Sequence, residues 1–91
     1  MTIKVGIIGA GAIADDHCKN LQKHPGAQVV AVADLSEERR ARVKKDYQLA
    51  RDYAKWEDLV NDRGLDAVVV ALPNAFHAPV SLAALKAGKH V

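Results

Sequence analysis

The sequence predicts a doubly wound α/β fold, in which helices cover both faces of a parallel sheet. Short apolar runs rich in β-branched residues alternate with stretches of helical periodicity, and no hairpin turn joins one run to the next. The runs are apolar at nearly every position, which is typical of parallel strands buried on both faces. With 91 residues, the chain has material for one domain at most.

The first half of the chain contains two strand–helix units. A strand is expected at residues 3–8 and stops at a glycine. Apolar side chains then recur at helical spacing over residues 12–23, and a Pro-Gly pair follows this helix. A second strand is expected at residues 29–33. Ser36 is placed to cap a second helix, which is acidic in its first turn and basic in its later turns.

The second half continues the alternation. An extended piece around residues 50–53 and a short helix precede a third strand at residues 66–72. A helix over residues 77–87 closes at a glycine, and residues 89–91 resemble the start of a fourth strand. The pattern is therefore βαβαβα plus the start of a fourth strand, which is half to two-thirds of a complete doubly wound domain.

Composition limits the classes of function. The chain is 49% hydrophobic and 26% charged, which is ordinary for a globular domain, and its formal net charge is only +2. A basic run from Arg39 to Lys45 is interpreted as the solvated face of a helix, because nucleic-acid binding normally needs a larger positive excess. The single cysteine, Cys18, is expected to be a buried thiol in a reducing, cytoplasmic setting. No segment has the length and character of an export signal or a membrane span.

A glycine-rich turn joins the first strand to the first helix. Gly9, Gly11 and Ala14 form a G-x-G-x-x-A motif. The first glycine permits a tight turn, the second lets the backbone approach a pyrophosphate, and the alanine allows close packing of helix on strand. Free N–H groups at the start of the helix attract the anion. The motif predicts a dinucleotide site of the Rossmann type.

Asp34, at the end of the second strand, strengthens this prediction because an acid at that place accepts hydrogen bonds from the adenosine ribose. Its charge would repel a 2′-phosphate, so NAD(H) is favoured over NADP(H), although Arg39 or Arg40 could turn toward a phosphate. The alternative is that Asp34 only caps a helix. The loop after the third strand holds Asn74 and leads to His77. These two residues could face the cofactor. Alternatively, Asn74 is a turn residue and His77 is a neighbour of the helix cap.

Other sites are disfavoured. Methyltransferases that use S-adenosylmethionine usually carry an acid where this chain has Ile8, and flavoproteins prefer glycine at the place of Ala14. Asp15, Asp16 and His17 are consecutive in a helix, so their side chains diverge and no metal site is expected. The two acids are interpreted as first-turn residues that suit the helix dipole.

Four motifs in order, VGIIGAGAIA at residues 5–14, VAVAD at 30–34, ALPN with His77 at 71–77 and ALKAGKHV at 84–91, resemble the N-terminal domain of the glucose-fructose oxidoreductase and inositol dehydrogenase family, Gfo/Idh/MocA. The resemblance covers the whole chain. It implies an NAD(P)-dependent oxidoreductase that acts on sugars, cyclitols or similar polyols. The expected cofactor contacts are Gly9, Gly11, Ala12, Ile13, Ala14, Asp34, Leu72, Pro73, Asn74 and His77.

The resemblance also implies that the catalytic lysine, in a Glu-Lys-Pro motif, and the substrate domain lie beyond Val91. Residues 1–91 are then expected to be a truncated NAD(P)-binding domain with no catalytic residue, inactive alone. The alternative is an isolated half-domain with little nucleotide binding. Either form is expected to self-associate, as a homodimer or larger species, through an uncovered edge of the strand at residues 3–8.

Overall fold

The computed structural model describes residues 2–71, 77–89 and 91; the side chains of residues 12, 13 and 77–79 also lie outside this description. Within the described part, four strands alternate with four helices: β1 (Ile3–Ile8), α1 (Ala12–Gln22), β2 (Ala27–Ala33), α2 (Glu37–Asp46), β3 (Arg51–Tyr53), α3 (Trp56–Val60), β4 (Ala67–Val70) and α4 (His77–Lys86). None of these helices is long and apolar enough to cross a membrane.

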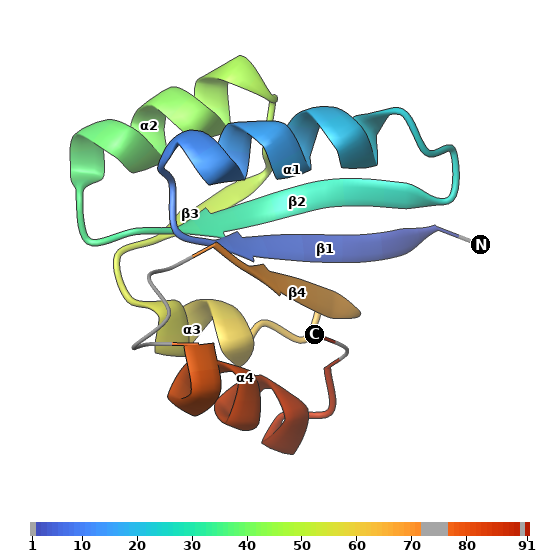
Figure 1. Cartoon of the computed structure of the whole chain (residues 1–91), viewed down its shortest axis with the longest axis vertical. Helices are drawn as coiled ribbons and strands as arrows, with labels where there is room; N and C mark the ends of the chain where they lie inside the picture. The colour runs from blue at the N-terminus through green and yellow to red at the C-terminus, as the bar shows by residue number, and fades with distance from the viewer. Residues whose placement is uncertain (1, 72–76, 90) are drawn as a thin grey trace.

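The strands form one parallel sheet in the order β3-β2-β1-β4. Helices α1 and α2 cover one face of the sheet, and α3 and α4 lie against the other (Figure 1). The doubly wound α/β prediction is therefore confirmed. The extended piece near residues 50–53 pairs with β2 as a short edge strand, Arg51–Tyr53, so the sheet has one strand more before residue 66 than the sequence pattern indicated.

The prediction that residues 3–8 leave one edge uncovered is wrong. β1 pairs with β2 on one side and with β4 on the other, from Val5 opposite Ala67 to Ile8 opposite Val70. The chain crosses the sheet through α3, so β4 takes the place that the sequence analysis had left for a later strand. The edge strands among the described residues are consequently β3 and β4.

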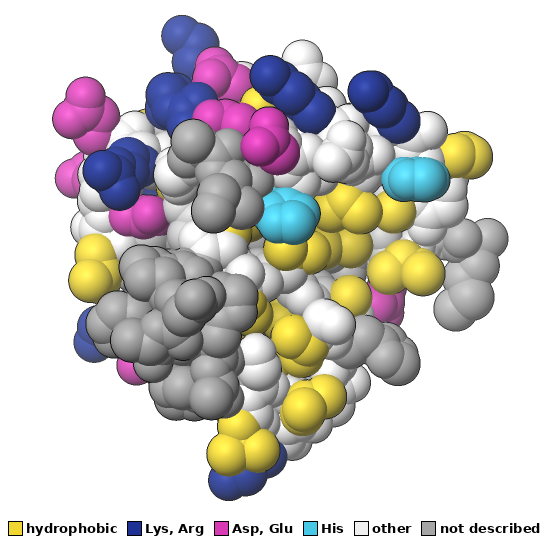
Figure 2. Space-filling model, in the orientation of Figure 1, with side chains coloured by type: hydrophobic (Ala, Val, Ile, Leu, Met, Phe, Trp, Pro, Cys, Tyr) yellow, Lys and Arg dark blue, Asp and Glu magenta, His cyan; other side chains and the backbone are white. Residues whose placement is uncertain are grey.

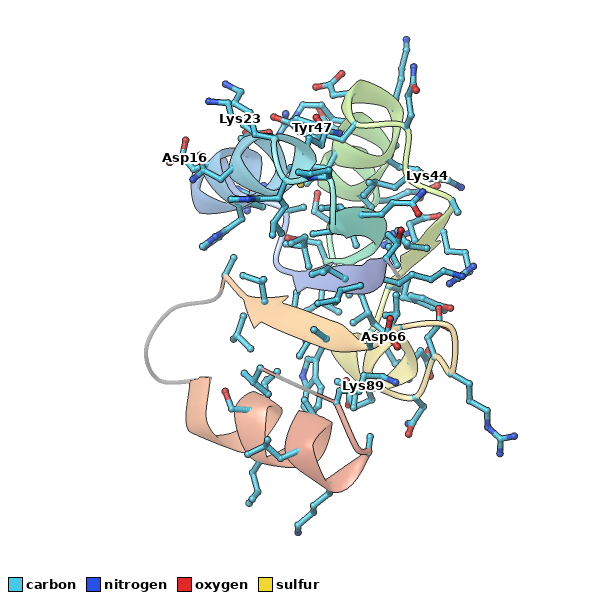
Figure 3. All side chains as sticks on the ribbon, turned by 90° about the vertical axis from the view of Figure 1, so that its right-hand side faces the viewer. Asp16, Lys23, Lys44, Tyr47, Asp66 and Lys89 are labelled. Atoms are coloured by element: carbon cyan, nitrogen blue, oxygen red, sulfur yellow. The ribbon has the colours of Figure 1, made fainter. Side chains whose placement is uncertain are left out.

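The expected strand start at residues 89–91 is also not observed: neither Lys89 nor Val91 is in a strand. Gly88 ends α4 with a positive φ of 81°, and the Lys89 N–H then donates to the Ala84 carbonyl at 3.0 Å. The Lys89 side chain is buried and its Nζ donates to the Leu65 carbonyl at 3.1 Å, between α4 and β4 (Figure 3). Lys89 thus connects the end of α4 to the segment that precedes β4.

Two hydrophobic clusters fill the space on either side of the sheet. Ile7, Cys18 and Val43 lie in the cluster under α1 and α2, whereas Ile8 and Leu59 lie in the cluster toward α3 and α4. The Cys18 side chain is fully buried, which confirms the expected burial of this thiol, and burial raises its thiol pKa to about 11.

The pairing of β1 with β2 contains one irregularity. Val5 lies opposite Val29, but the next residue, Gly6, lies opposite Ala31, so Val30 is an extra residue in β2. Val30 and Ala31 consequently belong to the same cluster, the one toward α3 and α4. This is the arrangement of a β-bulge, in which two residues of one strand face one residue of its neighbour.

Candidate functional site

The glycine turn lies where β1 ends, at the carboxyl edge of the sheet. Gly9 has a φ of 102°, a conformation that side-chain-bearing residues rarely adopt, and its N–H donates to the Ala33 carbonyl at 2.7 Å. The turn is therefore fastened to the end of β2. This is the role that the sequence analysis gave to the first glycine.

The start of α1 is open at its N-terminus. Gly11 is the N-cap and provides no side-chain hydrogen bond to the helix, and a Cβ placed on it would meet no atom within 4 Å. Ala14, one turn further, is fully buried in the cluster beneath α1. The small residues thus leave space above the helix start and allow close packing below it, as a phosphate-binding turn requires.

Asp34 connects this turn to the loop between β2 and α2. One carboxylate oxygen, Oδ2, accepts from the Ala10 N–H, and the other, Oδ1, accepts from the Ser36 N–H, both at 2.8 Å. The N-cap of α2 is Ser36, whose Oγ accepts from the Arg39 N–H at 3.3 Å. Asp34 is therefore not the helix cap that the alternative interpretation required. Its half-buried carboxylate keeps lone pairs for further donors, such as hydroxyl groups.

A pocket of about 420 Å³ opens beside Asp34, on the α3 side of the carboxyl edge. Leu35, which is 86% exposed, and the α3 residue Trp56 contribute apolar surface to it. The complete lining is Ile8, Ala33, Asp34, Leu35, Ala54, Lys55, Trp56 and Glu57. Sequence reasoning did not find the lining residues 54–57, which precede α3 and begin it. The one signal in the sequence was the leucine, Leu35, that directly follows the strand-ending acid.

The basic run on α2 was expected to be a solvated face, but some of its side chains make ion pairs with the rest of the chain. The Arg40 Nε contacts Asp52 Oδ2 at 3.1 Å, and Arg40 Nη1 donates to the Asp34 carbonyl at 2.9 Å. Lys44 Nζ contacts the other Asp52 oxygen at 3.2 Å. These two cations hold the pKa of the Asp52 carboxyl below its ordinary value, with hydrogen bonding from Arg40 the larger cause. Arg40 is therefore already engaged, whereas Arg39 is exposed.

A separate polar bridge joins α1 to α2 on the same face of the sheet. Arg42 on α2 binds both carboxylate oxygens of Asp15 on α1 at 3.2 Å, and the Tyr47 hydroxyl donates to Asp15 at 3.0 Å. The hydrogen bond from Arg42 is the main cause that lowers the Asp15 pKa. Asp15 is thus a first-turn acid, as expected, and it also ties α1 to α2.

Some predicted site residues cannot be placed. Leu72, Pro73 and Asn74 lie outside the described residues. His77 is the first residue of α4, as expected, but its side chain is not described; the same holds for Ala12 and Ile13 in the first turn of α1. The described site therefore consists of the glycine turn, the start of α1, Asp34 and the adjoining pocket.

Residues 3–91 match the family described as an oxidoreductase family with an NAD-binding Rossmann fold, Gfo/Idh/MocA. The chain belongs to this family. The resemblance drawn from the four motifs is thereby confirmed, and the glycine turn, open helix start and strand-ending acid are the features of the Gfo/Idh/MocA fold that the described residues provide.

Three relatives place the chain within Gfo/Idh/MocA. It is 40% identical over 93 residues to inositol 2-dehydrogenase from Salmonella typhimurium. It is 32% identical, with a TM-score of 0.94 over 100% of its length, to scyllo-inositol dehydrogenase from Lactobacillus casei with bound NAD(H) and scyllo-inositol. Biliverdin reductase from Synechocystis, in complex with biliverdin and NADP+, has a TM-score of 0.90 at 32% identity over 98% of the chain.

The matches cover only part of each relative. The chain spans 28% of the Salmonella enzyme and 27% of the Lactobacillus casei enzyme, while all of its own length is matched in both. It also covers 28% of the biliverdin reductase chain. The likeness therefore concerns the dinucleotide-binding fold.

Proposed function

We propose that residues 1–91 are the NAD(H)-binding domain of an oxidoreductase that transfers a hydride between nicotinamide and a carbinol carbon of a sugar, cyclitol or similar polyol. The observation that carries this proposal is the Asp34 carboxylate, held by the Ala10 and Ser36 amides beside the glycine turn. A relative with bound NAD(H) and the inositol-dehydrogenase names of other relatives support the cofactor and the polyol class.

The described residues suit two parts of the dinucleotide, the charged pyrophosphate and the adenosine ribose. Gly9, Gly11 and the backbone of Ala12 and Ile13 would face the pyrophosphate at the start of α1, with Ala14 allowing the close packing below. Asp34 would accept from the adenosine ribose hydroxyls. The adenine would enter the apolar pocket beside it.

The family resemblance assigns Leu72, Pro73, Asn74 and His77 to the nicotinamide half of the cofactor. The bound cofactor supplies the hydride acceptor or donor, and the hydroxyl proton of the substrate must pass to a base. We assign no catalytic residue to these 91 residues and propose that they bind the cofactor without turnover.

Calorimetric titration of the chain with NADH and NADPH tests this function. NADH should bind more tightly, and Asp34→Ser should narrow the difference by about one to two decades, since a hydrogen bond to a charged group contributes roughly 1.5–3 kcal/mol. Asp46→Ser, which removes an equal charge from the end of α2, is the matched control and should leave the ratio of affinities unchanged. Equal binding of both cofactors by the unchanged chain would disprove the role of Asp34.

The same titration distinguishes the proposed cofactor-binding domain from the alternative, an isolated half-domain. A chain that folds, as judged by circular dichroism, and binds neither cofactor would be the isolated half-domain without nucleotide binding. The cytoplasmic location stays a prediction. Its support is the buried, free thiol of Cys18.

We also infer that the chain self-associates, through β4 instead of the edge first expected. Among the described residues β4 pairs only with β1, and Ala67, Val69 and Val70 are half-buried. Hydrophobic side chains gather between α1 and α4 on this side of the molecule (Figure 2). Unpaired apolar edges promote pairing with another chain. Sedimentation should report a dimer or larger species at micromolar concentration, and Val69→Lys should weaken it; a folded monomer would contradict this.

A further inference from the structure

A cluster of one acid and two cations lies directly behind the proposed ribose site. Asp52 on β3 uses one carboxylate oxygen for Arg40 and the other for Lys44, at 3.1 and 3.2 Å. Figure 3 shows Lys44 on the side of the molecule where α2 and β3 lie. Both cations come from α2, the helix that follows the ribose-binding loop. Asp52 therefore directs two cationic side chains of α2 toward β3.

Arg40 is the member closest to the ribose site. Its Nη1 donates to the carbonyl of Asp34 at 2.9 Å, so the guanidinium lies one hydrogen bond from the backbone of the residue that would contact the ribose. The Arg40 side chain is only 14% exposed, against 42% for Lys44. A 2′-phosphate on the ribose would thus lie near a guanidinium whose donors are directed at Asp52 and the Asp34 carbonyl.

Cofactors with a 2′-phosphate are normally held by cations at this place, because arginine forms paired hydrogen bonds with phosphate oxygens. In this chain a phosphate would meet the Asp34 carboxylate, while the nearest guanidinium is neutralised by a second acid. Arg39 is exposed and makes no ion pair within the described residues, so it remains the only other arginine of the first helical turns that could approach.

We propose that Asp52 is a specificity-determining residue for the cofactor: by holding Arg40 toward β3, it withholds this guanidinium from a 2′-phosphate and so favours NAD(H) over NADP(H). This inference rests on the proposed function, since it presumes that the ribose lies at Asp34. Asp52 acts through Arg40 and has no contact with the cofactor itself.

The test measures the dissociation constants of NADH and NADPH for Asp52→Thr. Threonine suits a strand and is too short to hold both cations. Release of Arg40 should tighten NADPH binding about three- to tenfold relative to NADH, which is the range of a partly exposed charged hydrogen bond. The gain should be larger when Asp34→Ser also removes the repelling carboxylate.

Two controls separate the proposed effect from a general change of charge. Asp46→Thr removes the same charge from the end of α2, but the partner of Asp46 is Arg42, at 3.3 Å, so the ratio of affinities should not change. Adding Arg40→Gln to Asp52→Thr should abolish the gain. An equal gain with Asp46→Thr, or a gain that survives Arg40→Gln but disappears with Arg39→Gln, would overturn the proposal.

Circular dichroism and thermal unfolding show whether each variant is folded, and Asp52→Asn, which keeps the size of the side chain, replaces Asp52→Thr if the latter unfolds. The two proposals fail differently. If the unchanged chain binds no NADH, the proposed function fails. If it binds NADH and the affinity ratio of both Asp52 variants equals that of the unchanged chain, only the role of Asp52 fails.

Discussion

The two faces of the sheet are completed in different ways. On the α1/α2 face, Arg42 and Tyr47 bind Asp15, and charged side chains gather over both helices (Figure 2). On the α3/α4 face, no side-chain hydrogen bond or ion pair joins α3 to α4 within the described residues, and Leu82 and Leu85 of α4 are exposed. On the first face polar bridges link the two helices, whereas on the second, apart from the Lys89 contact with the Leu65 carbonyl, α3 and α4 meet through apolar packing and leave apolar surface exposed.

The largest expected effect tests the packing of the α3/α4 face. Leu59 is fully buried, and Leu59→Ala should lower the free energy of unfolding by about 2–5 kcal/mol, through lost burial and the cavity left behind. Urea unfolding measures this. On the other face the matched change Val43→Ala removes fewer buried atoms, and it should cost about 1–3 kcal/mol. A larger loss for Val43→Ala would reverse the comparison.

A smaller effect is expected where α3 approaches the sheet. A Cβ on Gly6 would lie 2.7 Å from Leu65 Cδ1 and 2.8 Å from Leu59 Cδ2. Gly6→Ala should therefore cost about 1–3 kcal/mol through overpacking. The loss should shrink in a Leu59→Ala background, because the two sites are in contact. Gly26→Ala, whose Cβ would meet no atom within 4 Å, is the control and should change stability by less than about 0.5 kcal/mol.

The smallest effect belongs to the polar bridge of the α1/α2 face. The Asp15 pKa is lowered in the folded chain, so its stabilising contribution is present above the ordinary value of 3.8 and is lost as the pH falls through the folded pKa. Since the Arg42 side chain is 44% exposed, Asp15→Asn should cost less than about 1 kcal/mol at neutral pH.

As the pH falls below the folded pKa of Asp15, the difference in stability between Asp15→Asn and the unchanged chain should disappear, which urea unfolding at a series of decreasing pH values would measure. Asp16→Asn, one residue further along α1, is the control and should have no comparable effect, because Asp16 is exposed. A loss at neutral pH that persists unchanged in acid would show that the Asp15 bridge does not act through its charge.

Local patterns predicted the elements well, because strands and helices here have strong periodicity and clear glycine and capping signals. Residues 3–8 and the start of the second helix after Ser36 were placed correctly. The position of β4 beside β1 depends on how the chain crosses the sheet, and the apolar run at residues 67–70 has the same composition wherever it pairs. The error about the uncovered edge therefore arose from topology.

The candidate site divides in the same way. Gly9, Gly11 and Asp34 could be predicted because the fingerprint dictates a backbone geometry and a charge at fixed spacing. The engagement of Arg40 by Asp52 could not, since β3 is three residues long and its pairing with β2 has no local signature. The role of Leu35 and Trp56 in the pocket could not be predicted, because the pocket forms where the ends of β1, β2 and β3 lie together in the folded chain.

The extra residue in β2 has a consequence for how the chain tolerates changes of length. Because side chains alternate along a strand, one added residue in a regular strand would direct every later side chain to the opposite face. The bulge prevents this, because Val30 and Ala31 lie in the same cluster and the residues after them keep the faces of their β1 partners. Deleting Val30 would therefore restore regular alternation from Val29 to Ala31, and Asp34 would still be directed at the Ala10 amide. At this place β2 can thus lose one residue without loss of the proposed ribose contact.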